Sequence, residues 1–196
     1  MPVRDDLGTR MKTYYESVPK FRLYKRIPIA IRIDGKAFHT FTRDFKKPFD
    51  EILIKSMQQT MLYLCENIQG CVLGYTQSDE ITLILQDYKT LTTSAWFDYE
   101  IQKICSISAS MATMAFNKYF SDNVVEFILS EDAKKAIEKG LPKAPYIVDS
   151  FYSLTDNEKD YVKILLKAVE KGAMFDARCF NIPKEEVTNL LYWRQL

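Results

Sequence analysis

The sequence has little of what several large protein classes require. Its 196 residues include a single histidine, His39, and only four cysteines, with no Cys-x-x-Cys pair among Cys65, Cys71, Cys105 and Cys179. A zinc site and a secreted disulfide framework are therefore not expected, and a reducing, cytoplasmic setting fits best. No apolar run approaches the ~20 residues that a membrane span needs, and the start of the chain contains no signal-peptide core. Internal repeats, low-complexity segments and Gly/Ser linkers are also absent.

Net charge is nearly absent too, but the charges are unevenly distributed. The chain carries 27 Lys and Arg against 26 Asp and Glu, yet residues 10–47 hold 11 basic and only 3 acidic side chains. Such a block is either an ordinary solvated surface or a surface that neutralises the phosphates of a nucleic acid or a polyphosphate. With 47% hydrophobic residues, the length fits one globular domain with a buried core.

Hydrophobic spacing and breaker residues predict a mixture of strands and helices. Alternation over 27–33 predicts a strand that ends at the turn Asp34-Gly35. Apolar residues at helical spacing follow Asp50, which can cap the first turn of that helix. The remaining expected elements are a β-hairpin at 71–75 and 81–85 around a polar tip at 76–80, helices at 3–18, 94–119, 130–139, 156–171 and 183–193, a strand at 174–181, a separate apolar run at 124–129, and a loop containing Pro142 and Pro145.

This order of elements predicts an α+β fold with a ferredoxin-like antiparallel sheet, whose fourth strand is delayed by an insertion. In that topology the first and third strands are central neighbours, so the end of the first lies beside the start of the third. Asp34 and Asp79 occupy those two ends, although 45 residues separate them in the chain. The sequence therefore predicts two adjacent carboxylates.

Adjacent carboxylates repel each other unless a cation neutralises them. Mg²⁺ suits this role, because it takes oxygen ligands from one or two carboxylates and completes its shell with phosphate oxygens and water. Two such ions can hold the attacking and leaving oxygens of a nucleotidyl transfer. The Gly35 carbonyl could add a ligand, and the backbone N–H groups of 36–39 could face a triphosphate. The alternative is a plain turn at Asp34-Gly35 and a solvated hairpin tip at Asp79-Glu80.

Two acidic blocks of the chain resemble signatures of the tRNA-histidine guanylyltransferase family. Residues 32–39, RIDGKAFH, followed by 47–50, KPFD, are similar to the first signature, and 74–80, GYTQSDE, to the second. The resemblance spans nearly the whole chain, because later blocks are also similar to the family's, at 175–178, 180–183 and 193–195. The details resemble the family's bacterial, archaeal and phage-type guanylyltransferase-like members.

The resemblance implies a magnesium-dependent nucleotidyltransferase with a polymerase-palm fold. Such an enzyme activates the 5′ end of tRNA with ATP or GTP and then adds GMP in the 3′–5′ direction, either guanylylating tRNA-histidine or, as we favour, repairing tRNA 5′ ends. It implies two Mg²⁺ ions held by Asp34, the Gly35 carbonyl and Asp79, with Glu80 as a third catalytic residue in a supporting role. It also implies that GTP and ATP, the substrates, are contacted by Asp34, Gly35, Lys36, Ala37, Phe38, His39, Lys47, Ser78, Asp79 and Lys103.

Ordinary structural roles compete with some of these assignments. Lys103 could be a plain exposed helix lysine, and Asp50 could be a helix cap rather than part of the binding site. His39 could act as a general base, but we expect it to pack or hydrogen-bond beside the nucleotide. Cys105 and Cys179 are expected in the core.

We expect one palm-type domain over 1–196 that acts on the 5′ end of tRNA. We expect no membrane partner, and we expect the chain to form a homodimer or tetramer, as in the family. In the family a further block and a C-terminal helical region that help bind tRNA follow Trp193-Arg194-Gln195; here the sequence stops at Leu196, so we expect a truncated chain or a member without those parts. Two alternatives stay open: a palm-type nucleotidyl cyclase, which the GYTQSDE hairpin disfavours, and a non-catalytic RNA-binding homologue, which Asp34 and Asp79 disfavour.

Overall fold

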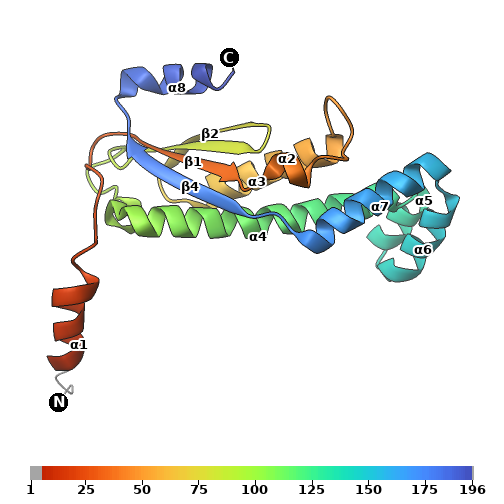
Figure 1. The fold of residues 1–196 in the computed structure, drawn as a ribbon, viewed down its shortest axis with the longest axis horizontal. Helices are drawn as coiled ribbons and strands as arrows, with labels where there is room; N and C mark the ends of the chain where they lie inside the picture. Colours follow the sequence, from red (N-terminus) through yellow and green to blue (C-terminus); the bar gives the residue numbers. More distant parts are fainter. Residues whose placement is uncertain (1–5, 196) are drawn as a thin grey trace.

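The computed structural model describes residues 6–195, in which four strands form one antiparallel sheet in the order β2-β3-β1-β4 (Figure 1). This order is that of a ferredoxin-like sheet, so the predicted α+β fold is confirmed. The strands are β1 (Ile29–Gly35), β2 (Cys71–Gln77), β3 (Glu80–Leu85) and β4 (Phe175–Asn181).

The helices agree with most of the predicted ranges. Asp50 caps the first long helix, as expected, because its side chain accepts a hydrogen bond from the Leu53 N–H at 3.0 Å. The predicted N-terminal helix is present from residue 6, and its first expected residues, 3–5, lie outside the described residues. The helices are α1 (Asp6–Met11), η1 (Lys12–Glu16), α2 (Phe38–Phe41), α3 (Glu51–Asn67), η2 (Trp96–Tyr99), α4 (Ile101–Ile128), α5 (Glu131–Glu138), α6 (Lys143–Ser153), α7 (Asp156–Lys171), η3 (Lys184–Glu186) and α8 (Val187–Trp193).

Three predicted boundaries are wrong. The helix expected from residue 94 begins only at Ile101, because the chain turns at Phe97 and Asp98, whose φ values of 50° and 52° are left-handed. The apolar run at 124–129 is the last turn of α4, because Val124 and Ile128 are buried where α4 packs against neighbouring helices. The expected loop around Pro145 is instead the start of α6. Proline is tolerated in the first turn of a helix, since the N–H groups there have no intrahelical acceptor.

The two faces of the sheet differ in chemistry. On one face, buried aliphatic side chains from alternate positions, such as Ile31 on β1 and Leu83 on β3, pack against α3 and α4. Next to them a cluster of phenylalanines fills the space at the end of β1, with rings from Phe38, Phe41, Phe45, Phe116, Phe120 and Phe175. This face holds the main core.

On the opposite face, three successive rows of side chains change from apolar to basic to acidic. Residues that pair across neighbouring antiparallel strands share a face, so the register fixes these rows. Val187 and Leu190 of α8 pack over the apolar row, which includes Ala30 and Ile84. The rows along the sheet are Ala30 with Ile84 and Phe180, Arg32 with Thr82 and Arg178, and Asp34 with Glu80 and Asp176.

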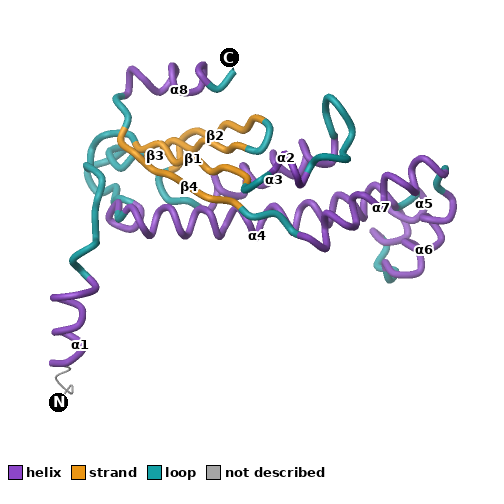
Figure 2. The backbone as a smooth tube through the Cα atoms, in the orientation of Figure 1, coloured by secondary structure: helices purple, strands orange, loops and turns teal. Residues whose placement is uncertain are grey.

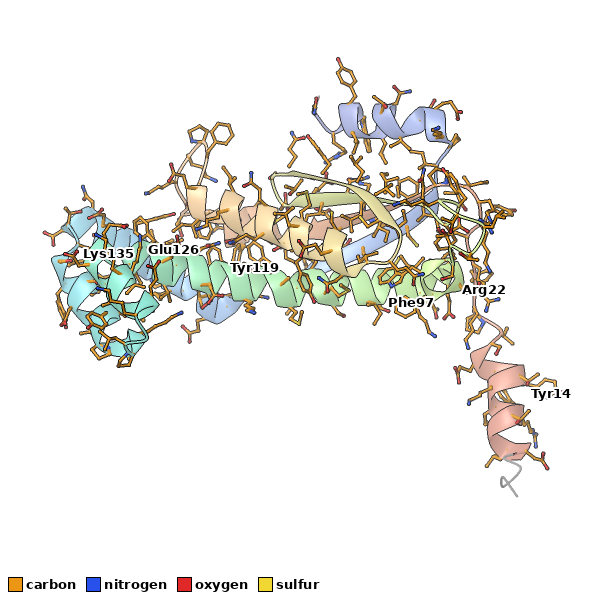
Figure 3. All side chains as sticks on the ribbon, turned by 180° about the vertical axis from the view of Figure 1, so that it is seen from behind. Tyr14, Arg22, Phe97, Tyr119, Glu126 and Lys135 are labelled. Carbon is orange, nitrogen blue, oxygen red and sulfur yellow. The ribbon has the colours of Figure 1, made fainter. Side chains whose placement is uncertain are left out.

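The remaining helices extend the molecule in two directions (Figure 2). Helices α5, α6 and α7 gather at the far end of α4, and α1 projects away from the sheet at the other end. Figure 3 places Arg22 and Phe97 at the end nearest α1, whereas Glu126 and Lys135 lie at the α5–α6 end. Among the described residues, no helix has both the length and the apolar character that crossing a membrane requires.

Candidate functional site

The structure brings Asp34 and Asp79 to the same end of the sheet, as the sequence predicted. Asp34 pairs with Glu80 in the β1–β3 register, and the Gly35 N–H donates to the Asp79 carbonyl at 3.2 Å. Both aspartates line a cavity of about 320 Å³ together with Gly35 and Ser78. The end of β1 and the tip of the hairpin therefore build one site.

Two tight turns fix the backbone of this site. A side chain at Gly35 would place its Cβ 2.2 Å from the Phe38 ring, so only glycine lets that ring pack against the end of β1. Ala37 then takes the left-handed conformation, with a φ of 53°, and starts α2. Ser78, with a φ of 54°, makes the corresponding turn between β2 and β3. The phenylalanine cluster thus supports the backbone of the site from the core side of the sheet.

The electrostatics of the site favour a cation. Burial raises the pKa of Asp34, and the negative charges of Asp79, Glu80 and Asp176 raise it further. Arg178 opposes this shift in pKa, with its Nη2 atom 3.9 Å from Oδ2 of Asp34. Arg178 is shared by Asp34 and Asp176, and Arg32 and Arg194 both pair with Glu80, so three guanidiniums face four carboxylates and the cluster keeps an excess of negative charge.

The donors present fit a magnesium ion that shares its ligands with a substrate. Within residues 6–195, no group of three or more His, Cys, Asp or Glu side chains is placed to hold a metal ion without other ligands. Mg²⁺ does not need such a group, since one or two carboxylates plus phosphate oxygens and water complete its shell. The excess negative charge at Asp34 and Asp79, with the Gly35 carbonyl beside them, matches that requirement.

The expected run of backbone N–H donors is shorter than predicted. The Lys36 N–H donates to the Met174 carbonyl at 2.8 Å and is therefore not available to a phosphate. The N–H groups of Phe38 and His39 belong to the first turn of α2, where N–H groups have no intrahelical acceptor. Both residues line the same cavity as the aspartates, and the His39 ring contacts the Thr40 hydroxyl at 3.1 Å.

The predicted lysines lie farther from the two aspartates. Lys36 lines a neighbouring cavity of about 330 Å³ with Lys171, and this cavity meets the first one at Ala37. Lys47 lies on the loop between α2 and α3, where its Nζ atom donates to the Thr42 carbonyl at 3.4 Å.

The structure does not bring Lys103 to the aspartates. Its Nζ atom lies 6.0 Å from the centre of the Phe97 ring, at the end of the molecule nearest α1 (Figure 3). The part of α4 that reaches the site is Thr113, whose hydroxyl accepts from the Phe175 N–H at 3.1 Å. Ten residues of helix span about 15 Å, which separates Lys103 from that point.

Glu80 is on the same face as Asp34, but its carboxylate is already paired. Its Oε1 atom accepts from Nη2 of Arg32 at 2.5 Å, and its Oε2 atom forms an ion pair with Arg194. The side chain is only 15% exposed. Glu80 therefore supports the site from beside it rather than from within the cavity.

Sequence reasoning assigned no role to the acidic and basic side chains of β4. Asp176 and Arg178 share the face of Asp34, and the Arg178 Nη2 atom is 3.4 Å from Oδ1 of Asp176. Strand alternation at 174–181 could have placed them on one face together. Only the pairing of β4 with β1 reveals which face that is, and this pairing is set by the fold.

A third cavity adjoins the aspartate site. It has a volume of about 360 Å³, lies between α3 and the hairpin, and shares Leu53 and Ser78 with the first cavity. Its other lining residues are mainly apolar with a few amide and hydroxyl groups, from Pro48, Phe49, Asp50, Ile54, Met57, Gln58, Thr76 and Gln77. The polar and the apolar cavity together form a continuous groove along the start of α3.

Fold and site together define the palm class: a ferredoxin-like sheet with acidic residues at the adjoining ends of two central strands. The chain belongs to the tRNAHis guanylyltransferase (Thg1) family, whose model matches residues 8–183.

Relatives and solved structures agree with this assignment. A probable tRNA(His) guanylyltransferase of Dictyostelium discoideum is 27% identical over 158 residues, covering 76% of this chain and 54% of the relative. A bacterial tRNA(His) guanylyltransferase (Thg1)-like protein in complex with GTP has a TM-score of 0.68 and 35% identity, covering 97% of this chain and 70% of that one. A bacterial Thg1-like protein in complex with ATP has a TM-score of 0.67 and 35% identity, covering 96% of this chain and 64% of that one. The chain spans about half the length of the curated relatives it matches.

Proposed function

We propose that the chain is a Mg²⁺-dependent nucleotidyltransferase that adds a nucleotide, GMP, to the 5′ end of tRNA in the 3′–5′ direction. The observation that carries this proposal is the cavity in which Asp34 and Asp79 stand beside the first turn of α2. Membership of the tRNAHis guanylyltransferase family supports the class of reaction, and the GTP and ATP complexes of the bacterial Thg1-like protein support the nucleotides.

Each group in the cavity has a task that suits its chemistry. Asp34, Asp79 and the Gly35 carbonyl would hold two magnesium ions, which supply charge neutralisation for the oxygens around the reacting phosphorus. The Ser78 hydroxyl donates to Oδ1 of Asp79 at 3.0 Å and so orients that carboxylate. The N–H groups of Phe38 and His39 would bind phosphate oxygens, because both residues line the cavity in the first turn of α2.

The adjoining cavities give a nucleotide a defined orientation. The triphosphate would lie at the carboxylates and the first turn of α2, and the nucleoside would extend into the more apolar cavity beyond Leu53 and Ser78. Lys36 and Lys47 stand at the edges of this groove, where they would add positive charge toward phosphates. Lys103 would act on phosphates only where the RNA or a second triphosphate extends toward the α1 end.

The reaction consists of two transfers. In the first, the 5′-monophosphate of tRNA attacks the α-phosphorus of ATP, or sometimes GTP, and pyrophosphate leaves. In the second, the 3′-hydroxyl of the incoming GTP attacks the activated 5′ phosphorus, loses its proton and displaces the nucleoside monophosphate. The added nucleotide then still carries its 5′-triphosphate, and net addition of GMP is completed when water displaces pyrophosphate from it. We favour repair of truncated tRNA 5′ ends over tRNA-histidine alone, in the cytoplasm, by one palm-type domain that assembles into a dimer or tetramer.

The direct test is extension of a tRNA that lacks its 5′-terminal nucleotide. The purified chain is incubated with Mg²⁺, ATP, labelled GTP and this RNA, and the label on the 5′ end is measured. Extension that disappears in Asp79→Ala supports the proposal. A cyclic nucleotide formed without RNA would replace it with a cyclase, and tight RNA binding without turnover would replace it with a binding protein.

A further inference from the structure

Next to the candidate active site, Glu80 is paired through both of its carboxylate oxygens. Four residues make up this group, which we call the Glu80 clamp: Arg32, Glu80, Trp193 and Arg194. Glu80 follows Asp79 in the chain and faces Asp34 across the β1–β3 pair. Glu80 is therefore directly adjacent to both candidate metal ligands.

Both oxygens of the Glu80 carboxylate are held by guanidinium groups from different elements. Arg32 of β1 binds Oε1, and Arg194, which follows α8, binds Oε2. Hydrogen bonds between charged partners are about twice as strong as neutral ones, and a planar guanidinium fixes direction as well as distance. Because Glu80 is mostly buried, solvent screens these contacts only weakly.

Trp193 ties the two arginines together. The guanidinium carbon of Arg32 lies 5.2 Å from the centre of the Trp193 ring, and that of Arg194 lies 4.9 Å from it. Both guanidinium groups therefore contact the Trp193 ring and also pair with the Glu80 carboxylate, so the four side chains contact one another. Within the described residues, the Arg194 Nε atom is the buried side-chain polar atom that finds no hydrogen-bond partner. Arg194 thus keeps its position although one of its own donors is unsatisfied, which indicates that the contacts to Glu80 and Trp193 dominate.

The remaining contacts of α8 are few, so the clamp is its main polar attachment to the sheet. Val187 and Leu190 pack over the small apolar row around Ala30 and Ile84. That cluster lies two rows from Asp34 and does not touch the carboxylates. Only the end of α8 reaches the acidic row.

We propose that Arg194 is a positioning residue, which through Glu80 keeps Asp34 and Asp79 in the geometry that binds Mg²⁺ and a nucleoside triphosphate. The inference rests on the proposed function of that site. In this arrangement Glu80 has a role that needs no contact with a metal. The segment after α8 then helps to position the candidate active site.

The test is a double-mutant cycle with Arg194→Ala, Glu80→Gln and the double variant, measured by tRNA 5′ extension. Arg194→Ala lowers kcat/KM for GTP about tenfold to a hundredfold, as expected for the loss of a charged hydrogen bond. The KM for tRNA changes less than about threefold, because Arg194 acts through Glu80. For the same reason the double variant is no worse than Glu80→Gln alone. Arg194→Lys recovers part of the loss, since it restores the charge without the planar fork.

Arg22→Ala is the matched control, because Arg22 also forms an ion pair with an acid, Asp98, but at the other end of the sheet. Urea unfolding of every variant separates mispositioning from loss of fold. Additive losses in the cycle, or an Arg194→Ala enzyme that matches Arg22→Ala within twofold, would overturn the proposal.

A wild-type chain without tRNA extension would contradict the proposed function but still leave the clamp testable. The same cycle is then measured as the dissociation constant of Mg²⁺·GTP by calorimetry. Weaker binding in Arg194→Ala, without further loss in the double variant, supports the clamp. Equal binding in all four proteins overturns it.

Discussion

The two ends of the sheet both carry clusters of charge, but only one of them is balanced. At the end nearest α1, Asp98 pairs with Arg22 and Lys25, and buried Asp87 accepts from the Arg26 N–H at 2.9 Å. At the other end, Arg32 and Arg194 pair only with Glu80, and Arg178 is the one cation beside the remaining carboxylates of Asp34, Asp79 and Asp176 among the described residues. The paired cluster supports the fold, whereas the unbalanced cluster has an excess of negative charge that a bound cation would neutralise.

The basic residues of the block at 10–47 are divided between these two ends of the sheet. The excess of Lys and Arg does not form one surface around Asp34. Arg22 and Lys25 pair with Asp98 and the Arg26 guanidinium donates to the Asp87 backbone carbonyl, all at the α1 end, whereas Lys36 and the exposed lysines after α2 remain near the site. This second group is the part of the block that would meet the phosphates of the proposed substrates.

The largest expected effect comes from removing a carboxylate at the unbalanced end. Asp79→Asn lowers the rate of tRNA 5′ extension by at least about a thousandfold, since the charge that would hold the metal ions is lost. Asp98→Asn, at the balanced end, leaves the rate within about twofold, because that acid is remote from the cavity. Initial rates at saturating GTP and RNA measure both variants. Similar losses in the two would remove the distinction between the ends.

A stability loss should appear at the balanced end instead. Asp87 is 2% exposed and is bound by the Arg26 N–H and the Tyr99 hydroxyl, so Asp87→Ala leaves both donors unsatisfied. We expect about 1–3 kcal/mol less free energy of unfolding, measured with urea. The corresponding value for Asp79→Asn should not fall, because that change removes repulsion from Asp34. A less stable Asp79→Asn would show that the site's charges are already balanced.

The two ends should respond to pH with opposite signs. The pKa of Asp34 is raised above 3.8 by burial and neighbouring carboxylates, so its contribution to stability is present below pH 3.8 and is lost as the pH rises through its folded value. The pKa of Asp98 is lowered, mainly by its hydrogen bond with Lys25, so its contribution is present above 3.8 and is lost as the pH falls.

Urea unfolding across this pH range, with a chelator present, measures both slopes. Asp34→Asn should remove a decline of stability with rising pH, and Asp98→Asn should remove an increase. Slopes of the same sign in the two variants would contradict the charge assignment.

The smallest effect concerns the exposed ion pair at the balanced end. Arg22→Ala should barely shift the urea midpoint, because exposed ion pairs are screened by solvent and salt. The remaining partner of Asp98, Lys25, still pairs with it. A shift as large as that of Asp87→Ala would mean that this end depends on surface charge rather than on its buried carboxylate.

The sequence predicts those parts of the site that local pattern and topology determine. Asp34 and Asp79 are strand-end residues, and the element order alone makes those ends neighbours. The helix cap at Asp50 is likewise a local signal, and the structure confirms it.

Long-range packing determines the parts that the sequence did not predict. Arg194 reaches Glu80 only because α8 returns across the open face of the sheet. α4 ends beyond residue 119 because its last turns keep helical spacing, with Val124 and Ile128 buried and Glu126 exposed, but the apolar, β-branched run at 124–129 masks that spacing in the sequence. Lys103 matches a family position, but helix length places it away from the aspartates.

The most direct test of the unbalanced cluster is calorimetric titration of GTP into the chain with and without Mg²⁺, repeated with Asp34→Asn. We predict that Mg²⁺ tightens GTP binding to the wild-type chain at least about tenfold and that Asp34→Asn abolishes this gain. Equal GTP affinity with and without Mg²⁺ in the wild-type chain would contradict this prediction.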